Sequence, residues 1–393
     1  MPRFLQNICY IALPALVSAG LVSAALVEVW VRVRWDDTRG TPGFYLSDPV
    51  RGQRLAPGYR GWFAGVPVSI NSLGFRDERE YSLAKPPGTF RIIVLGDSVT
   101  FGHGTLSDTT YPFLLEQRLE RWRPDVKWQV WNLGVPGYNT SQELAYLREV
   151  GDRYAPDLVI IGFYPNDFTA NEPLAAPSPA RRITSAVQRT MQKYFYSYEF
   201  YRRVYLTARW RFVGDAAYRE QIGNLSGEEA LLNRPGGAAD AAEQRLTEVE
   251  VFDDQQVRDF ACPSATGPNA RDDRMRSRYL KRSPEVVSWI DAVRELQRLN
   301  RDGRYRLMFF VNMAPQVCDG SDRFYDAGIM DDDALLKEVL GDGTPVVSST
   351  AAYLHYRPSQ MPAASGHAVG NANVVKADVL FEFLRAQALV PGS

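Results

Sequence analysis

The sequence has no excess of charge of either sign, because its 45 lysine and arginine residues nearly balance its 46 aspartate and glutamate residues. A protein that binds nucleic acid through phosphates needs a basic excess, and the balance therefore argues against a nucleic-acid partner. No group of His, Cys, Asp and Glu has the spacing of metal ligands. Gly102-His103-Gly104 lacks the third glycine of a dinucleotide-binding fingerprint. We therefore expect neither a metal nor another cofactor.

Cysteine is scarce, with three residues in the chain. Cys9 lies in an apolar N-terminal segment, which leaves Cys262 and Cys318 as the only cysteines in the rest of the sequence. Both lie in polar, loop-like surroundings, and in an oxidising compartment they would pair. Two unrelated free thiols are the other interpretation.

The N-terminal segment from residue 4 to residue 27 contains 24 residues without a charge. At 1.5 Å per residue, a helix of this length spans roughly 36 Å, enough to cross a bilayer core of about 30 Å. We interpret residues 1–35 as a transmembrane anchor that contacts membrane lipid. A signal peptide cleaved near Ser23 is the alternative. Ala15, Ala19 and Ser23 form a stripe of small residues against which a helix of a larger membrane protein complex could pack.

Beyond the anchor, short apolar runs alternate with helical patterns. Strands are expected at 91–95, 127–132, 157–163, 306–312 and 344–347, and helices at 111–122, 143–154, 284–300 and 374–388. This alternation predicts βαβ units and an α/β fold with a parallel sheet that is covered on both faces.

Two stretches fall outside the alternation. Residues 36–90 are rich in Gly, Pro and Arg, and we expect an extended lead-in that packs on the main domain. Residues 175–285 are expected to form an insertion that partly covers the working edge of the sheet. Within it, the aromatic and Arg-rich run Tyr194–Arg211 is interpreted as an amphipathic helix near the membrane, with binding of an anionic polymer as the alternative.

Three of the expected strands end in polar or glycine-rich turns, at the edge where open parallel sheets bind ligands. These turns are 96–102 (GDSVTFG), 132–138 (NLGVPGY) and 162–167 (GFYPND). Ser98 follows a buried strand and opens a helix, Gly134 can bring a bare backbone N–H toward a bound oxygen, and Asn166 supplies an amide. A hydroxyl flanked by such donors is the layout of a nucleophile with an oxyanion hole.

The three turns, in this order, resemble the first three blocks of the SGNH (GDSL-type) serine hydrolases. The resemblance covers residues 91–174 and 286–390, and it implies a flavodoxin-like three-layer sandwich with a five-stranded parallel sheet. It also implies that Ser98 is the nucleophile, with its own backbone N–H, Gly134 and Asn166 as oxyanion donors. Turn geometry alone is the competing explanation for Gly134 and Asn166.

The fourth block of the family departs from its pattern here. The family places an Asp three residues before a catalytic His, just ahead of the last helix, and His367 lies at the matching distance from that helix. Position 364, however, is Ala. A second register puts the catalytic position on Met361 and the acid position on Pro358, which would leave a dead site. Of the other histidines, His103 is expected to line the pocket and His355 to be structural or exposed.

Two functions stay open. The first is a membrane-anchored, slow esterase or deacylase that acts on O-acyl groups of lipid or cell-envelope glycan through Ser98 and His367. The second is a hydrolase-fold protein without acid–base machinery that serves as a structural subunit of a membrane complex. Arg3 precedes the span while Arg32, Arg34 and Arg39 follow it, so the positive-inside rule does not support an external domain. The family resemblance favours a periplasmic one.

Overall fold

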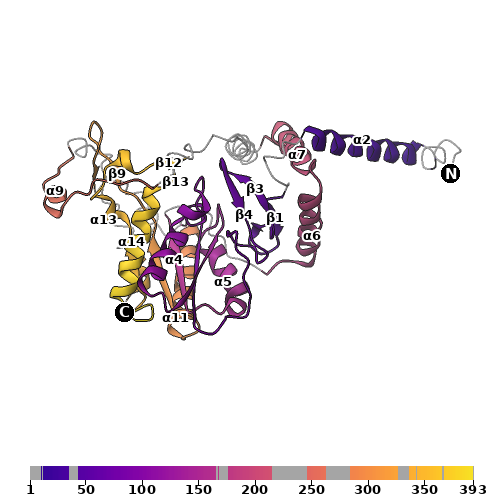
Figure 1. Ribbon diagram of the computed structural model, residues 1–393. Coiled ribbons are helices and arrows are strands. Elements are labelled where there is room, and N and C mark those ends of the chain that lie inside the picture. Colours follow the sequence, from indigo (N-terminus) through magenta and orange to yellow (C-terminus); the bar gives the residue numbers. More distant parts are fainter. Residues whose placement is uncertain are drawn as a thin grey trace.

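The computed structural model describes residues 10, 12–34, 43–164, 167, 176–214, 246–262, 284–325, 336–341, 343–364 and 367–392. Its centre is an α/β body from which one long helix projects at the N-terminal end (Figure 1).

The body is organised around a five-stranded parallel sheet in the order β11-β8-β7-β5-β6. Its strands are β5 (Thr89–Gly96), β6 (Lys127–Gly134), β7 (Leu158–Phe163), β8 (Leu307–Val311) and β11 (Val346–Ser348). Counted along the chain, the second strand pairs with the first, and the third, fourth and fifth follow on the other side of the first. The predicted flavodoxin-like order and all five predicted strands are confirmed.

Alternate residues of the strands feed two separate apolar cores, because successive side chains of a strand point to opposite faces. Ile93 and Leu95 face α5 (Thr140–Tyr154) and α11 (Pro284–Arg301), whereas Ile92 and Val94 face the opposite layer. That layer is formed by α4 (Tyr111–Trp122) and α14 (Asn371–Ala386), which lie side by side. Helices on both faces of the sheet make the predicted three-layer sandwich (Figure 1).

The segment before the core is more regular than the expected extended lead-in. It forms two antiparallel hairpins, β1 (Tyr45–Asp48) with β2 (Gly52–Leu55), and β3 (Arg60–Phe63) with β4 (Val66–Ser69). Their strands are only four residues long, too short for a periodic pattern to appear in the sequence. The segment packs on the core as predicted, since Phe75 stacks on Trp131 of β6 with ring centroids 4.9 Å apart.

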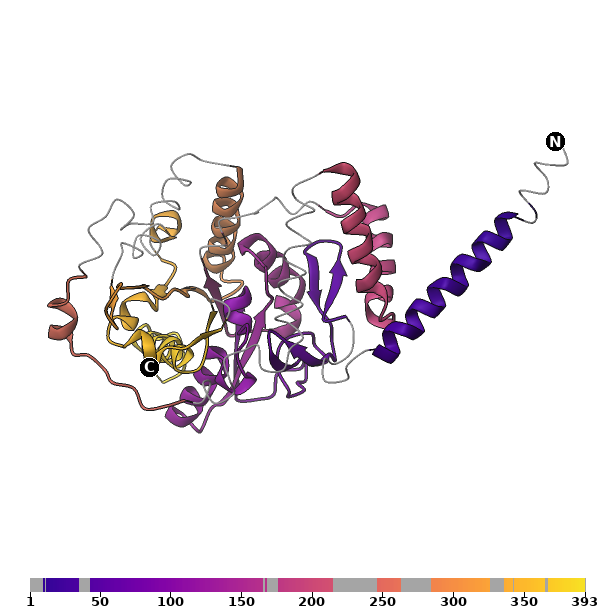
Figure 2. The same cartoon turned by 90° about the horizontal axis from the view of Figure 1, so that it is seen from above.

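The apolar helix α2 (Leu13–Arg34) continues beyond residue 27, where the uncharged segment ends. Glu28 and Arg32 extend it as an i, i+4 ion pair, with Arg32 Nε 2.6 Å from Glu28 Oε1. Among the described helices, α2 alone has the length and composition of a membrane span, which fits a membrane anchor or a signal sequence. Figure 2 shows it projecting from the body of the molecule.

The expected insertion contributes two long helices, α6 (Pro179–Tyr194) and α7 (Tyr198–Val213), in place of one helix over Tyr194–Arg211. The chain turns at residues 195–197, where Ser197 is buried. Further along lie α9 (Asp254–Arg258) and the small elements around the site. These are β9 (Gln316–Val317), β10 (Phe324–Tyr325), α13 (Thr350–Tyr353), β12 (Ala363–Ala364) and β13 (His367–Ala368).

Cys262 and Cys318 form a disulfide with Cα atoms 5.8 Å apart, which confirms the predicted pairing. The bond ties the insertion to the segment that follows β8.

Reduction of this bond is expected to destabilise the protein. The cysteines lie 56 residues apart, and closing a loop of that length in the unfolded chain is worth about 4 kcal/mol in the chain-entropy model. A Cys262→Ser, Cys318→Ser double variant should therefore unfold at a lower urea concentration than the oxidised wild type. Reduced wild-type protein is the matched control and should unfold close to the double variant. An unchanged midpoint on reduction would contradict this expectation.

Candidate active site

Ser98 is the first residue of α3 (Ser98–Phe101), a single helical turn that starts directly after β5. Asp97 caps this turn, because its Oδ1 accepts a hydrogen bond from the backbone N–H of Val99 at 2.8 Å. The turn ends at Gly102, whose φ of 86° is the left-handed conformation that glycine tolerates best. The hydroxyl of Ser98 is therefore held at the carboxyl edge of the sheet, as the sequence predicted.

His367 reaches Ser98 from the other end of the chain. Its Nε2 lies 2.8 Å from Ser98 Oγ, a hydrogen bond within the distance that a general base requires. His367 begins β13 and pairs with Ala364 across the short β12–β13 hairpin, which fixes its backbone just before α14. Met361, the catalytic position of the second register, instead packs in an apolar cluster with Tyr353 and Val375. The geometry supports the first register.

His103 covers the imidazole of His367. The two rings stack with centroids 4.4 Å apart and planes inclined by 24°. His103 is fixed from two sides, since its backbone N–H donates to Ser98 O at 2.9 Å and Phe63 meets its ring edge-on at 5.3 Å. Burial, with smaller contributions from His367 and Arg76, lowers the pKa of His103 to about 4. His103 is thus neutral at neutral pH. The sequence predicted that His103 lines the pocket but did not predict that it stacks on His367.

The buried His103 should make stability depend on pH below neutrality. Its pKa is about 4 in the folded protein and about 6.5 in the unfolded chain, so the unfolded state binds the proton more tightly. The free energy of unfolding should therefore fall as the pH drops, by about 2 kcal/mol from pH 7 to 4.5 through this group alone. Urea unfolding of wild type and His103→Phe at both pH values measures the difference, because phenylalanine keeps the ring but cannot titrate. Equal pH dependence in the two proteins would contradict the assignment.

Gly134 ends β6 at a point where the backbone of α3 approaches it closely. A Cβ atom there would lie 2.2 Å from the backbone nitrogen of Phe101 and 2.7 Å from the carbonyl carbon of Thr100. The N–H of Gly134 donates to Asn132 Oδ1 at 3.0 Å. A substrate oxygen at this N–H would share it with Asn132 or displace that amide. Gly134 therefore has a packing role, and its role as an oxyanion donor stays a prediction.

Asn166, the other predicted oxyanion donor, lies outside the described residues. Its neighbour Asp167 is fully buried and accepts a hydrogen bond from Tyr164 N at 3.1 Å. Behind the site, burial raises the pKa of Glu143 and of Asp167 well above the usual range, and the charge of Asp97 acts in the same direction. Burial lowers the pKa of Lys376 to about 8, opposed by Asp97.

The burial of these ionisable side chains was not predicted, because Glu143 and Lys376 lie in ordinary amphipathic helices. Among the residues that the structure describes, no group of three or more His, Cys, Asp or Glu side chains is arranged to hold a metal ion.

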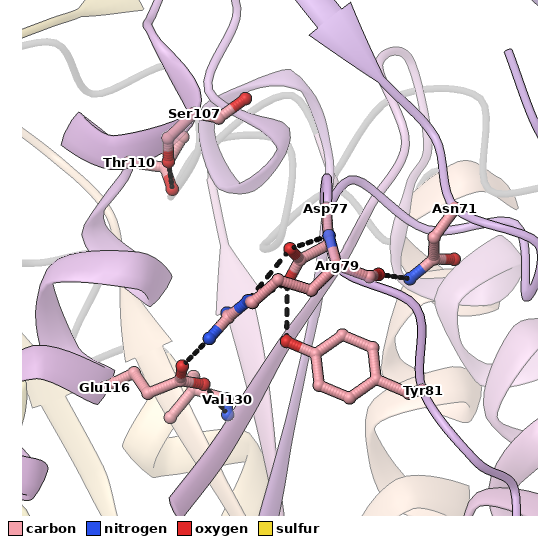
Figure 3. Close-up of polar contacts among 8 residues, drawn as sticks. All are labelled: Asn71, Asp77, Arg79, Tyr81, Ser107, Thr110, Glu116 and Val130. Atoms are coloured by element: carbon pink, nitrogen blue, oxygen red, sulfur yellow. Dashed lines mark hydrogen bonds and ion pairs between the residues drawn. The ribbon is translucent and has the colours of Figure 1, made fainter. Parts of the chain in front are cut away.

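A separate cavity of about 360 Å³ is lined by residues of the lead-in, of segment 106–113 and of β6. Its lining comprises Pro67, Arg76, Asp77, Glu78, Arg79, Leu106, Ser107, Asp108, Thr110, Phe113, Val130 and Asn132, and does not include Ser98. Figure 3 shows the polar contacts of two of its lining residues, Asp77 and Arg79. Arg79 is paired with Asp77 and Glu116, and Tyr81 donates to Asp77 at 2.8 Å. We interpret these contacts as the seam that holds the lead-in against the core.

Comparison with known proteins finds one matching family. Residues 94–232 match the model of the GDSL-like Lipase/Acylhydrolase family. Over these residues the chain is similar to GDSL-like acylhydrolases, and the predicted resemblance to the SGNH hydrolases is confirmed. The match includes Ser98 and Gly134 and ends before His367, so the assignment of His367 depends on its contact with Ser98.

Several solved structures are similar to this chain. An acetylxylan esterase from Geobacillus stearothermophilus is 11% identical, with coverage of 75% of this chain and 94% of that one and a TM-score of 0.34. A GDSL-like lipase from Bacteroides thetaiotaomicron is 9% identical, with coverage of 79% and 91% and a TM-score of 0.31. An α/β hydrolase from a metagenome of Lake Arreo, Spain, is 14% identical, with coverage of 76% and 95% and a TM-score of 0.36. Among curated proteins, no match was found.

Proposed function

We propose that this protein is a membrane-anchored serine esterase that hydrolyses O-acyl groups of lipid or cell-envelope glycan. The observation that carries the proposal is the 2.8 Å hydrogen bond between Ser98 Oγ and His367 Nε2. A protein without acid–base machinery would have no imidazole at its serine, so this contact favours the esterase over the structural subunit.

In the proposed reaction, His367 Nε2 takes the proton of Ser98 as Oγ attacks the acyl carbonyl carbon. The negative oxygen of the tetrahedral intermediate would be stabilised by the backbone N–H of Ser98, by Gly134 and by Asn166. The imidazolium then returns its proton to the leaving alcohol. Water, activated by the same imidazole, attacks the acyl-serine ester, releases the carboxylic acid and restores Ser98.

His103 would take over part of the role of the carboxylate that the family places at position 364, where this chain has Ala. In a serine triad the acid holds the imidazole in place and stabilises the imidazolium. Here the stacked ring of His103 restricts rotation of His367, and the β12–β13 hairpin restricts its backbone. Because His103 remains neutral, it adds no positive charge beside the imidazolium. It supplies no compensating negative charge either, so we expect turnover to be slow.

The proposed location is the periplasmic side of a membrane. Two features support it: helix α2 has the length and composition of a span, and the Cys262–Cys318 disulfide is typical of an oxidising compartment. Lipid would surround the apolar part of α2. The face of Ala15, Ala19 and Ser23 is open for a further membrane helix, and copurification of a membrane protein with the full chain would test that partnership.

The proposal is tested with the full chain in detergent and a short activated ester such as p-nitrophenyl butyrate. We expect slow turnover, with labelling of Ser98 by a fluorophosphonate. Ser98→Ala should lose both the labelling and the turnover, because the attacking oxygen is gone. Ser107→Ala, which removes a hydroxyl from the separate cavity, is the matched control and should behave like wild type. A folded wild type that neither turns over the ester nor reacts with the phosphonate would refute the esterase.

A further inference from the structure

Helix α6 packs on the body through its polar face. Gln192 Oε1 accepts from Ser47 N of β1 at 2.7 Å, Arg189 donates to Ser47 O at 3.3 Å, and Gln188 contacts the Ser47 hydroxyl at 3.0 Å. Ser185, on the same face, is the one buried residue of the helix. A surface helix ordinarily buries its apolar face instead, so this orientation is inverted.

The apolar face of α6 consequently points away from the protein. Ile183, Val187, Met191 and Tyr194 recur at helical spacing on one stripe, and their exposed fractions range from 37% to 66%. Helix α7 also exposes apolar and aromatic side chains. Its Leu206 is buried, while Phe200, Tyr201, Val204 and Tyr205 are 39% to 57% exposed. Large apolar side chains gathered on exposed helix faces mark an interaction site.

Helix α2 is fastened to the corner between these two helices. The carboxylate of Glu28 accepts from Tyr196 N at 3.1 Å, from Ser197 N at 2.9 Å and from the Ser197 hydroxyl at 2.6 Å. Arg32 Nη2 donates to Tyr194 O at 2.8 Å. An aromatic contact adds to this junction: the rings of Trp30 and Phe200 pack edge to face with centroids 6.4 Å apart. The exposed faces of α6 and α7 thus begin where the candidate span ends (Figures 1 and 2).

The composition of the two helices identifies the occupant. Residues 179–213 contain eight basic residues and one acidic residue, in a chain whose total charge is balanced. Basic residues beside an apolar and aromatic face are the signature of a helix that lies in the interface of an anionic bilayer. Tyrosine is also enriched at the level of lipid headgroups.

We propose that α6 and α7 lie in the headgroup layer of an anionic membrane, beside the point where α2 enters it. The apolar stripes would face the acyl boundary, and basic residues other than Arg189, which is bonded to Ser47, would contact lipid phosphates. This inference rests on the anchoring proposed for α2, and it is independent of ester hydrolysis.

The test places a bimane dye on single cysteines in the full chain, with Cys9→Ala as background, in vesicles that contain brominated lipid. The dye positions are Val187→Cys on α6, Val204→Cys on α7, Val17→Cys on α2 and Glu120→Cys on α4. Quenching at Val187 and Val204 should be at least about twofold, because interfacial helices bury their apolar faces about 5–10 Å deep. The exposed Glu120 position should show none. Replacing phosphatidylglycerol by phosphatidylcholine should weaken quenching at α6 and α7 and leave Val17 unchanged.

The outcomes are separable. Quenching at Val17 without quenching at Val187 and Val204 would overturn the proposal and leave the anchor intact. A dye at Val187 that is shielded from aqueous iodide but not quenched by lipid would reveal a protein occupant, either a second copy or a membrane subunit, and would also overturn it. An unquenched Val17 would refute the anchor, and with it this inference. Ester turnover of the labelled proteins reports separately on the proposed hydrolase.

Discussion

His367→Ala is expected to lower kcat for a short activated ester by about 10³-fold or more, because the serine loses its proton acceptor. KM should change little, since the imidazole acts on the reacting proton and not on the bound acyl chain. The measurement is steady-state kinetics of the full chain in detergent. The drop should be largest near neutral pH, where the imidazole can act as a base.

His355→Ala is the matched control. The Nδ1 atom of His355 lies 2.8 Å from Phe252 O and does not contact Ser98. The His355→Ala variant should therefore retain kcat. The variants His103→Ala and His103→Phe distinguish the contribution of ring stacking to kcat from that of the general base His367. The alanine variant should lose kcat while the phenylalanine variant keeps most of it, because phenylalanine preserves the ring packed on His367. Wild-type kcat in His367→Ala would show that another group accepts the serine proton.

Gly134→Ala is expected to destabilise the fold by about 3 kcal/mol or more, since overpacking against immovable atoms is costly. The added Cβ would meet the backbone of Phe101 and Thr100, and backbone cannot rotate away as a side chain can. Relief requires a shift of α3, which carries Ser98, so ester turnover should fall together with the melting temperature. Thermal unfolding by circular dichroism and the kinetic assay measure the two effects.

Gly137→Ala, in the same turn, is the comparison. Its Cβ would meet only the amide nitrogen of Gln53 at 3.6 Å, and the cost should be about 1–2 kcal/mol from its positive φ of 81°. If Gly134 served only as an N–H donor, Gly134→Ala would fold with nearly wild-type stability, because alanine has the same N–H. That result would contradict the packing role.

The sheet was predictable because its strands are short apolar runs with turns directly behind them, and each such run is a local signal. The position of Ser98 was predicted from a local pattern as well, since it follows a strand and opens a helix, whereas His367 was predicted from the family resemblance through its distance from the last helix. The apolar run that predicts the span ends at residue 27, yet α2 continues to Arg34 past Glu28, whose carboxylate accepts hydrogen bonds from Ser197 and Tyr196, far away in sequence. Whether a helix continues past a charge depends on such distant partners.

The stack of His103 on His367 could not be predicted, because it joins loops that are brought together only by the complete sheet. The inverted packing of α6 is a further case. Its sequence pattern indicates an amphipathic helix but does not tell which face meets the protein, and the hydrogen bonds to Ser47 decide that question. The burial of the ionisable side chains of Glu143 and Lys376 could not be predicted either, since it depends on which elements pack over them in the folded protein.

If α2 anchors the protein as proposed, the junction of Glu28 and Arg32 with residues 194–197 also limits how the proposed esterase would reach a substrate. A domain on a flexible linker sweeps out a volume whose radius grows with the linker, and it meets targets at many heights and angles. Here the candidate span itself is hydrogen-bonded to the domain, so an anchored protein would keep only rotation about the membrane normal and lateral diffusion. On the proposed function, Ser98 would then stay at a fixed height above the membrane, and an ester outside that layer would be out of reach however high its concentration.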